Sequence, residues 1–194
     1  SPWTYYLPGG ISIGAGKVLT VSAGRVVKPG LNTEFYVAGT LNVNGTSGNK
    51  VYFTDFRDDT VGGDSNGDGL TSGRAGDWAF LWYYNPTNVL HDALLRYGGC
   101  SYGMVVLQAP ASGSVMEMRN LILEEADLAG LRVLSGQMPW LHGSTIRNCV
   151  RGVYADVPVR VEQNTISGCT WGLDVDGGSS VITGSCSTMP SKGR

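Results

Sequence analysis

Apolar residues recur along this chain in short alternating runs, which glycine-containing turns separate. Alternation with a period of two is typical of β-strands, and Gly after Ala, Pro or Asn marks turns. The clearest runs are residues 18–21, 35–37, 41–43 and 51–53. Only residues 124–128 have a helical pattern, and that stretch is too short to form a helix by itself. The pattern therefore predicts an all-β chain of many short strands.

An internal repeat organises the second half of the chain. The pattern Ile-x-x-Cys-x-x-Gly-apolar begins at Ile146 and recurs at Ile166, an interval of 20 residues. Weaker copies surround Cys100 and Ala126, so the spacing of the units ranges from 20 to 26 residues. A unit of this length is typical of one coil of a parallel β-helix, with three short strands and three turns.

Stacked coils turn each repeated position into a column of side chains, with strands roughly 4.8 Å apart. We expect one inward column of small side chains, one turn column of glycines in which a positive φ is tolerated, and one aliphatic core column. In that order, the columns are Cys100, Ala126, Cys149 and Cys169; Gly103, Gly130, Gly152 and Gly172; and Met104, Leu131, Val153 and Leu173. A leucine-rich repeat would require a leucine signature that is missing here, and a β-sandwich would not produce columns of fixed period. The predicted fold is a single-stranded right-handed parallel β-helix (a solenoid), with residues 1–194 as a single domain.

One acidic segment has the pattern of a calcium-binding loop. Residues 64–69 read D-x-N-x-D-G, which is the first half of an EF-hand-type loop. The pattern makes ligands of the side chains of Asp64, Asn66 and Asp68 and of the backbone carbonyl of Leu70. Ala75 stands where the usual bidentate Glu would be, so further oxygens must come from nearby acids, for which Asp58, Asp59 and Asp77 are the candidates. The alternative is a solvated Gly/Asp turn that binds no metal.

The segment 44–78 also resembles a known family. It contains Asn-Gly-Thr at 44–46, Val-Tyr-Phe-Thr at 51–54, Arg-Asp-Asp at 57–59, the acidic loop, and Gly-Asp-Trp at 76–78. These motifs resemble the right-handed parallel β-helix repeat proteins of bacterial surfaces and secretions, which are related to the pectate-lyase-like superfold. The resemblance implies that residues 55–78 form an acidic loop insertion that projects from one coil. One departure is the bulky aromatic run 79–84, where the family often has a Gly-Gly-aliphatic strand.

Composition excludes several classes of partner. Gly accounts for 29 of 194 residues, roughly twice the average share, and charged residues for only 15%. The net charge is −2 without a basic run, which argues against nucleic acid and anionic membranes as partners. The chain contains no run of 18 apolar residues, so we expect no segment that spans a bilayer. Residues 1–5 are not a signal peptide, and we expect a piece of a longer extracellular or cell-surface protein with further domains.

The cysteines and histidines give weaker signals. Stacked cysteines approach bonding distance, but their parallel Cβ vectors favour buried free thiols over disulfides. His91 and His142 look isolated in the sequence, so no Ser-His-Asp arrangement can be argued from it.

Two function classes remain open. The first is a non-catalytic calcium-binding module for surface structure, adhesion or glycan binding, with a polysaccharide or cell-surface glycan as partner. The second is a carbohydrate-active enzyme of the lyase or glycosidase type. Its weak catalytic candidates are Asp156, Asp174 and Asp176, with Arg132, Arg151 and Arg160 as substrate clamps. Solvated ion pairs, such as an Arg96-Glu124-Arg147 ladder, are the simpler interpretation of these charges.

A glycan contact is predicted at one aromatic strand. Alternation places Trp82 and Tyr84 on the same face of residues 80–84, opposite Leu81 and Tyr83. Exposed aromatic rings stack on sugar faces, whereas buried ones would only cap the core. The sequence does not decide which pair of side chains faces outward.

Overall fold

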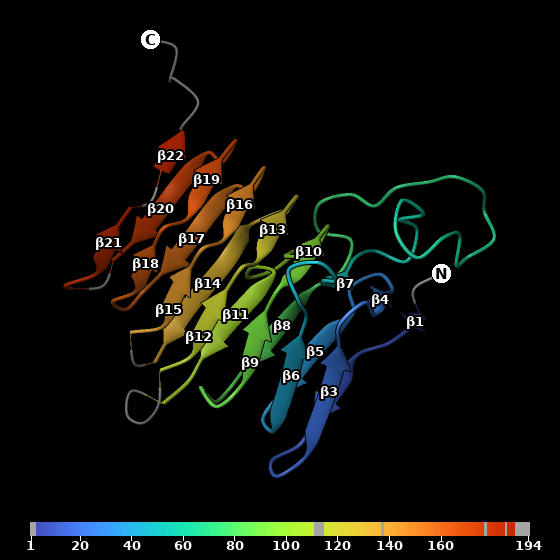
Figure 1. The fold of residues 1–194 in the computed structure, drawn as a ribbon, viewed down its shortest axis with the longest axis horizontal. Helices are drawn as coiled ribbons and strands as arrows, with labels where there is room; N and C mark the ends of the chain where they lie inside the picture. The colour runs from blue at the N-terminus through green and yellow to red at the C-terminus, as the bar shows by residue number, and fades with distance from the viewer. Residues whose placement is uncertain (1–2, 111–114, 137, 177, 185, 189–194) are drawn as a thin grey trace.

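The computed structural model describes residues 3–110, 115–136, 138–176, 178–184 and 186–188. Within these residues the chain is all-β, without helices, and it winds through three parallel sheets in about eight coils. Figure 1 shows strands β1, β3 and β4 at one end of the solenoid and strands β18, β20 and β21 near the other. The predicted parallel β-helix is therefore confirmed.

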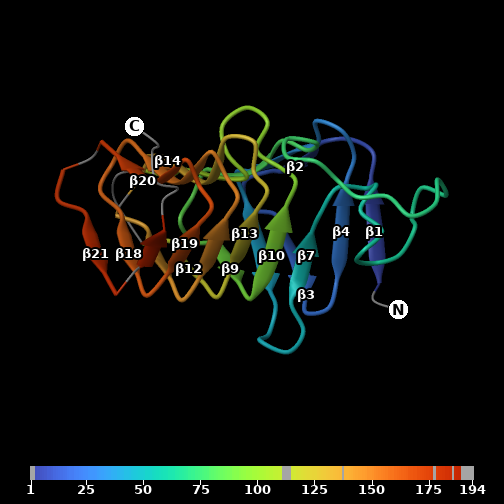
Figure 2. The same ribbon diagram turned by 90° about the horizontal axis from the view of Figure 1, so that it is seen from above.

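Each coil contributes one strand to each sheet, so the order of strands in space follows the chain (Figure 2). Sheet A consists of β1 (Thr4–Leu7), β4 (Val26–Pro29), β7 (Val51–Phe53), β10 (Ala93–Arg96), β13 (Ile122–Glu124), β16 (Thr145–Arg147), β19 (Thr165–Ser167) and β22 (Cys186–Thr188). Sheet B consists of β2 (Ile11–Ile13), β5 (Glu34–Val37), β8 (Phe80–Tyr83), β11 (Val105–Gln108), β14 (Ala129–Ser135), β17 (Arg151–Ala155) and β20 (Trp171–Val175). Sheet C consists of β3 (Val18–Ser22), β6 (Thr40–Asn44), β9 (Val89–His91), β12 (Glu117–Arg119), β15 (Trp140–His142), β18 (Arg160–Glu162) and β21 (Val181–Thr183).

The core lies inside the coils, because alternate side chains of every strand point inward. Sheet A illustrates the stacking with one continuous column of apolar residues in register. The column is Val27, Phe53, Leu95, Leu123, Ile146 and Ile166. Each such residue is almost fully buried and stabilises the fold by roughly 1.5–3 kcal/mol.

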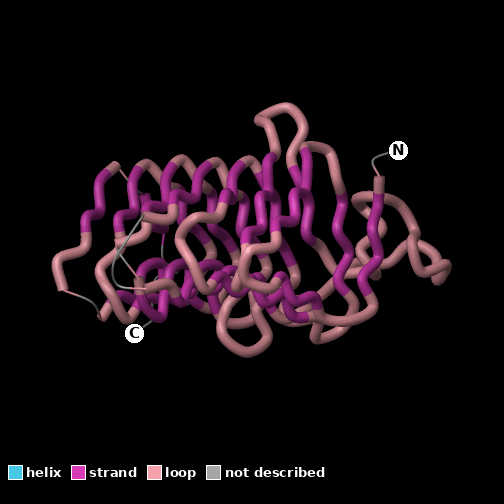
Figure 3. Tube along the Cα trace, turned by 90° about the horizontal axis from the view of Figure 1, so that it is seen from below, coloured by secondary structure: helices cyan, strands magenta, loops and turns pink. Residues whose placement is uncertain are grey.

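Single residues in the left-handed conformation turn the chain between sheets. Between sheets C and A this position is occupied by Asp92, Asn120 and Gln163, with φ of 49°, 54° and 54°. Between sheets A and B, Glu125 and Asn148 do the same, with φ of 54° and 56°. The strands form the walls of the solenoid, and the loops gather at its corners (Figure 3). Asn and Asp tolerate this conformation well, which accounts for the turns at Asp92, Asn120 and Asn148 but not for those at Gln163 and Glu125.

The predicted glycine turn column is wrong for three of its four members, and only Gly103 lies outside a strand with a positive φ, of 158°. Gly130, Gly152 and Gly172 lie within strands β14, β17 and β20, and the first two do not have a positive φ. A Cβ atom at Gly152 would collide with the carbonyl oxygen of Gly172 and lie 2.8 Å from Cγ2 of Ile166. Glycine is needed there because neighbouring coils approach closely.

The two other columns are confirmed in part. Ala126, Cys149 and Cys169 belong to the core, but Cys100 is only partly buried and packs outside it. In the aliphatic column, Val105 rather than Met104 pairs with Leu131. The register differs by one residue at Met104, which is nevertheless fully buried.

Candidate functional site

The acidic segment forms a long loop between β7 and β8 that extends away from the solenoid (Figure 1). Its two ends are clamped by Arg57, whose Nε atom lies 2.8 Å from Oδ1 of Asp55 and whose Nη2 atom lies 2.6 Å from Oδ2 of Asp77. Trp78 closes the loop as a fully buried anchor and donates from Nε1 to the carbonyl of Arg96 at 2.8 Å. Burial raises the pKa of Asp55, and the hydrogen bonds from Arg57 oppose that shift. The base of the loop is thus fixed by ion pairs and packing.

Three of the predicted metal ligands meet in this loop. One carboxylate oxygen from each of Asp59, Asp64 and Asp68 lies within 4.8 Å of the other two. Asp64 accepts backbone hydrogen bonds from Gly67 at 2.6 Å and from Gly69 at 3.1 Å, which lower the pKa of its carboxyl. The D-x-N-x-D-G pattern folds in this way because glycine at 67 and 69 adopts the positive φ that the turn requires.

Of the other two predicted ligands in the motif, Asn66 contacts the cluster through Asp68, whereas the side chain of Leu70 points to solvent. Asn66 donates from Nδ2 to Oδ2 of Asp68 at 2.8 Å, and the Leu70 side chain is 96% exposed. Thr71 was missed by the sequence analysis, yet its hydroxyl lies 3.1 Å from Oδ2 of Asp59 and 3.2 Å from Oδ1 of Asp68. No motif marks Thr71, because it reaches the cluster only through the fold of the loop.

Asp58 and Asp77 do not join the cluster. Asp58 is fully buried, and its carboxylate accepts hydrogen bonds from the hydroxyls of Thr54 and Thr60 and from Arg96, the last at 2.8 Å. Asp77 binds Arg57. Both carboxylates hold the loop in place, so within the described residues the candidate metal centre is Asp59, Asp64 and Asp68.

A ladder of charges runs across the outer face of sheet A beneath this loop. Arg96, Glu124 and Arg147 are in register on neighbouring coils, as predicted, and the Arg–Glu distances are 3.6 Å and 2.5 Å. The rung before Arg96 is the neutral Thr54, at which the loop supplies the carboxylate of Asp58 instead. The rung before that is Lys28, whose Nζ atom lies 3.9 Å from Oδ1 of Asp59. The loop therefore completes an alternation of charges that the strands alone leave interrupted.

Lys28 carries a fully buried side chain, which donates to the carbonyl of Gly63 at 2.5 Å. Burial lowers the pKa of Lys28, and the neighbouring carboxylates, above all Asp59 and Asp58, partly offset that shift. The lysine lies between the sheet and the acidic cluster, so it belongs to the electrostatics of the candidate metal centre.

Successive side chains of the aromatic strand β8 alternate between the core and the outer face of sheet B, as the sequence predicts. Leu81 and Tyr83 enter the core, whereas Phe80 and Trp82 lie on the outer face of sheet B in a second apolar cluster. Tyr84 stacks on Trp82 with centroids 5.9 Å apart. The predicted pair of Trp82 and Tyr84 therefore shares the outer face.

The two rings differ in exposure. Trp82 is only 8% exposed, because Tyr102 packs edge-on against it at 4.8 Å and Tyr36 lies on its other side at 6.2 Å. Tyr84 and Tyr102 are 37% and 44% exposed. A ligand on this face would meet the tyrosines, while Trp82 supports them from below.

The weak catalytic candidates are engaged in ion pairs. Asp156 lies 2.6 Å from Arg132, and Asp174 lies 2.6 Å from Arg151, while Asp176 is exposed. Both arginines also cover the ring of Tyr154, at 3.8 Å and 4.6 Å from its centroid. The third proposed clamp, Arg160, lies on sheet C.

Sheet C carries a polar cluster that the sequence analysis missed. His91, Arg119 and His142 are in register on successive coils. His91 lies 2.8 Å from Asp92 and His142 lies 2.8 Å from Glu117, so the description of the histidines as isolated is wrong. Arg119 reaches both carboxylates, at 3.3 Å and 3.7 Å. The signal that could have located this cluster is the register of the strands, which the sequence repeat shows only in part.

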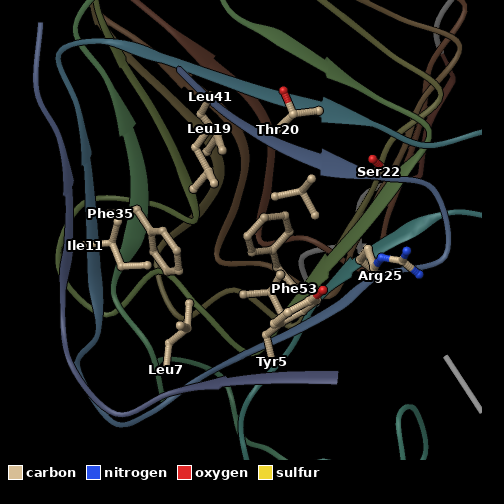
Figure 4. A pocket seen from close by; sticks show the side chains of 12 residues that line it. Tyr5, Leu7, Ile11, Leu19, Thr20, Ser22, Arg25, Phe35, Leu41 and Phe53 are labelled. Atoms are coloured by element: carbon tan, nitrogen blue, oxygen red, sulfur yellow. The ribbon is translucent and has the colours of Figure 1, made fainter. Parts of the chain in front are cut away.

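The first coil surrounds an open apolar cavity of about 410 Å³ at one end of the solenoid. Leu7, Ile11, Phe35 and Phe53 point toward one another inside it, and Arg25 stands to one side (Figure 4). The cavity is a continuation of the core column rather than a pocket built by loops.

Of the cysteines that the structure describes, Cys149 and Cys169 are buried and all three, including Cys100, are free. A hydrogen bond with Cys169, together with burial, raises the pKa of the Cys149 thiol. Cys186 was the fourth cysteine of the sequence analysis, and its side chain lies outside the described residues.

Comparisons of the chain with protein-family models, with curated proteins and with solved structures each found no match. The fold consequently rests on the structure itself, and the family resemblance of the motifs belongs to the proposal below. In the part of the chain that the structure describes, no helix has the length and hydropathy needed to cross a membrane.

Proposed function

We propose that the chain is a non-catalytic, calcium-binding β-helix module that acts outside the cell or at its surface, in surface structure, adhesion or glycan binding. The observation that carries this proposal is the cluster of Asp59, Asp64 and Asp68, whose oxygens lie within 4.8 Å of one another. Three carboxylates this close repel one another unless a cation neutralises them. Ca²⁺ is a hard cation and prefers oxygen ligands, whereas softer metals prefer nitrogen or sulfur ligands.

The chemistry of the donor set fits calcium. Ca²⁺ takes about six to eight oxygen ligands and tolerates irregular geometry. Besides the three carboxylates, the Asn66 side chain, the Thr71 hydroxyl and the Leu70 carbonyl are available within the same loop. The side chain of Asp59 is only 1% exposed, and its Oδ1 atom is buried without a hydrogen-bond partner. The ammonium of Lys28, at 3.9 Å, is too far away to hydrogen-bond to this oxygen, and a bound cation would supply the missing contact.

The resemblance of residues 44–78 to secreted and surface β-helix proteins of bacteria supports the extracellular location in this proposal. Further domains of a longer chain are part of the same proposal, as is its relation to the pectate-lyase-like superfold. Three exposed or partly exposed tyrosines favour glycan binding as a second candidate function. Tyr36, Tyr84 and Tyr102 surround Trp82 on the outer face of sheet B and could stack on sugar rings.

The alternative is a carbohydrate-active enzyme on the same fold. The ion pairs of Asp156 with Arg132 and of Asp174 with Arg151 favour the non-catalytic proposal. Each of these carboxylates is occupied by an arginine in the structure, so neither is free to hydrogen-bond a glycosidic oxygen in this arrangement.

Calorimetric titration of chelator-treated protein with CaCl₂ tests the metal proposal. We expect saturable binding to the wild type and at least a tenfold loss of affinity in Asp64→Asn and Asp68→Asn. Asp176→Asn is the matched control, since it removes one exposed carboxylate far along the chain. Calcium at about 100 times Kd should stabilise the fold by about 2.7 kcal/mol. A wild type that neither binds calcium nor melts higher with it refutes the proposal.

A glycan array tests the second candidate, with the wild type and Tyr84→Ala compared in calcium and in EDTA. Binding to a defined glycan that Tyr84→Ala loses, at unchanged melting temperature, supports a sugar site on sheet B. Cleavage of a bound polysaccharide would instead establish the enzyme alternative, and Asp156→Asn and Asp174→Asn would then identify the acid.

A further inference from the structure

The side chain of Lys28 is fully buried between sheet A and the acidic loop, an unusual position for a lysine. It follows Val27, a core residue, on β4 and so points to the outer face of the sheet, where the loop covers it. Its Nζ atom donates to the carbonyl of Gly63 at 2.5 Å, next to Asp64. A buried ammonium needs a compensating charge, and the loop supplies one.

The nearest carboxylate is that of Asp59, which is also a member of the candidate metal centre. Its Oδ1 atom lies 3.9 Å from Nζ of Lys28, beyond hydrogen-bond distance, and has no hydrogen-bond partner in the structure. Its Oδ2 atom accepts from the backbone N–H of Thr71 at 2.8 Å. Asp59 therefore faces two partners: the ammonium of Lys28 on the sheet, and the carboxylates of Asp64 and Asp68 in the loop.

We propose that the ammonium of Lys28 is a built-in cation of the acidic loop, which holds the loop on the solenoid in the absence of metal and weakens its binding of a divalent cation. This inference rests on the proposed calcium site. Lys28 and calcium both neutralise Asp59, so each lowers the benefit that the other provides. The site should therefore bind calcium weakly and respond to high, extracellular concentrations rather than to traces of the metal.

The test is a calcium titration of Lys28→Met beside the wild type and Lys17→Met. Methionine keeps the length and apolar stem of Lys28 without the charge. Lys17 is an exposed lysine in the turn before β3, so Lys17→Met is matched in net charge. Removing one positive charge beside a ligand carboxylate should tighten calcium binding by roughly tenfold or more, whereas Lys17→Met should leave it nearly unchanged.

A second readout is the melting temperature in EDTA and in millimolar calcium. We expect Lys28→Met to melt lower than the wild type in EDTA and to gain more from calcium. If Lys28→Met unfolds in EDTA and refolds with calcium, the metal replaces the ammonium, and the proposal is supported. Failure to fold at any calcium concentration contradicts it.

The outcomes separate this inference from the proposed function. If the wild type binds no calcium, both the proposed calcium site and the role of Lys28 are refuted. A wild type that binds calcium, with Lys28→Met binding equally or more weakly, overturns the role of Lys28 and leaves the calcium site intact.

Discussion

The Nε atom of Arg96 lies 2.8 Å from Oδ2 of Asp58, although one residue belongs to strand β10 and the other to the projecting loop. This ion pair inserts a loop carboxylate into the charge ladder of sheet A, at the level of the neutral Thr54. The loop is thus attached to the solenoid wall at this level as well as at its base, where Arg57 and Trp78 hold it. The position of the candidate metal centre depends on that attachment, because Asp58 and Asp59 are neighbours.

Removal of Arg96 should destabilise the fold strongly. Arg96→Met leaves the fully buried carboxylate of Asp58 without its cation, and we expect a loss of about 3–5 kcal/mol in the free energy of unfolding. Urea denaturation measures the loss. Arg147→Met is the control, because Arg147 is half exposed and its partner Glu124 would keep Arg96 at 3.6 Å, so we expect a smaller loss than in Arg96→Met. Equal effects of the two variants would show that the ladder does not depend on Asp58.

Trp82 should behave as a packing residue. It is 8% exposed beneath Tyr84 and Tyr102, so Trp82→Ala is expected to lose about 3–5 kcal/mol of stability. Tyr84→Ala, at the more exposed ring, should cost much less. Thermal or chemical unfolding of both variants makes the comparison. A Trp82→Ala protein of unchanged stability would mean that the second apolar cluster contributes little.

The close approach of neighbouring coils makes Gly152 sensitive to any side chain. Gly152→Ala would place Cβ against the carbonyl oxygen of Gly172 and 2.8 Å from Cγ2 of Ile166, and we expect a cost of about 1–3 kcal/mol. Gly14→Ala is the matched control, because no heavy atom lies within 4 Å of its added Cβ. We expect Gly152→Ala to melt at a lower temperature than Gly14→Ala. Similar melting temperatures for the two variants would contradict the close stacking described for β17 and β20.

Tyr83 offers a substitution that should stabilise the protein. Its hydroxyl is buried in the core without a hydrogen-bond partner, and burial raises its pKa. Tyr83→Phe removes the unsatisfied group and should gain about 1 kcal/mol. Tyr84→Phe, at an exposed ring, should be neutral. A loss of stability in Tyr83→Phe would indicate that the hydroxyl has a partner, such as a buried water molecule.

The sequence was sufficient to predict the solenoid, because stacking in register repeats the same side-chain environment along the chain. Ile146 and Ile166 are 20 residues apart in sequence and pair directly in sheet A. The same logic failed at Met104, where an irregular segment before β11 shifts the register by one residue. It also misjudged Gly152, because close approach and positive φ both select glycine, and a sequence cannot distinguish the two causes.

The three carboxylates of the cluster were all among the ligands predicted from the sequence, but the sequence could not separate Asp59 from Asp58 and Asp77. Asp64 and Asp68 follow from the motif, and the structure places Asp59 beside them. Asp58 and Asp77 were indistinguishable from ligands in the sequence, since their partners Arg96 and Arg57 are determined by how the loop docks. The burial of Lys28 could not be predicted from the sequence, because the loop that covers this side chain follows it at a distance along the chain.

The most direct test of the calcium site is a crystal structure of the protein grown with CaCl₂, with the metal located by anomalous scattering. The proposed calcium site requires one strong anomalous peak in the loop, with oxygens of Asp59, Asp64 and Asp68 at roughly 2.3–2.6 Å from the ion. A well-ordered loop without a peak at these carboxylates, from crystals grown in millimolar calcium, would contradict it.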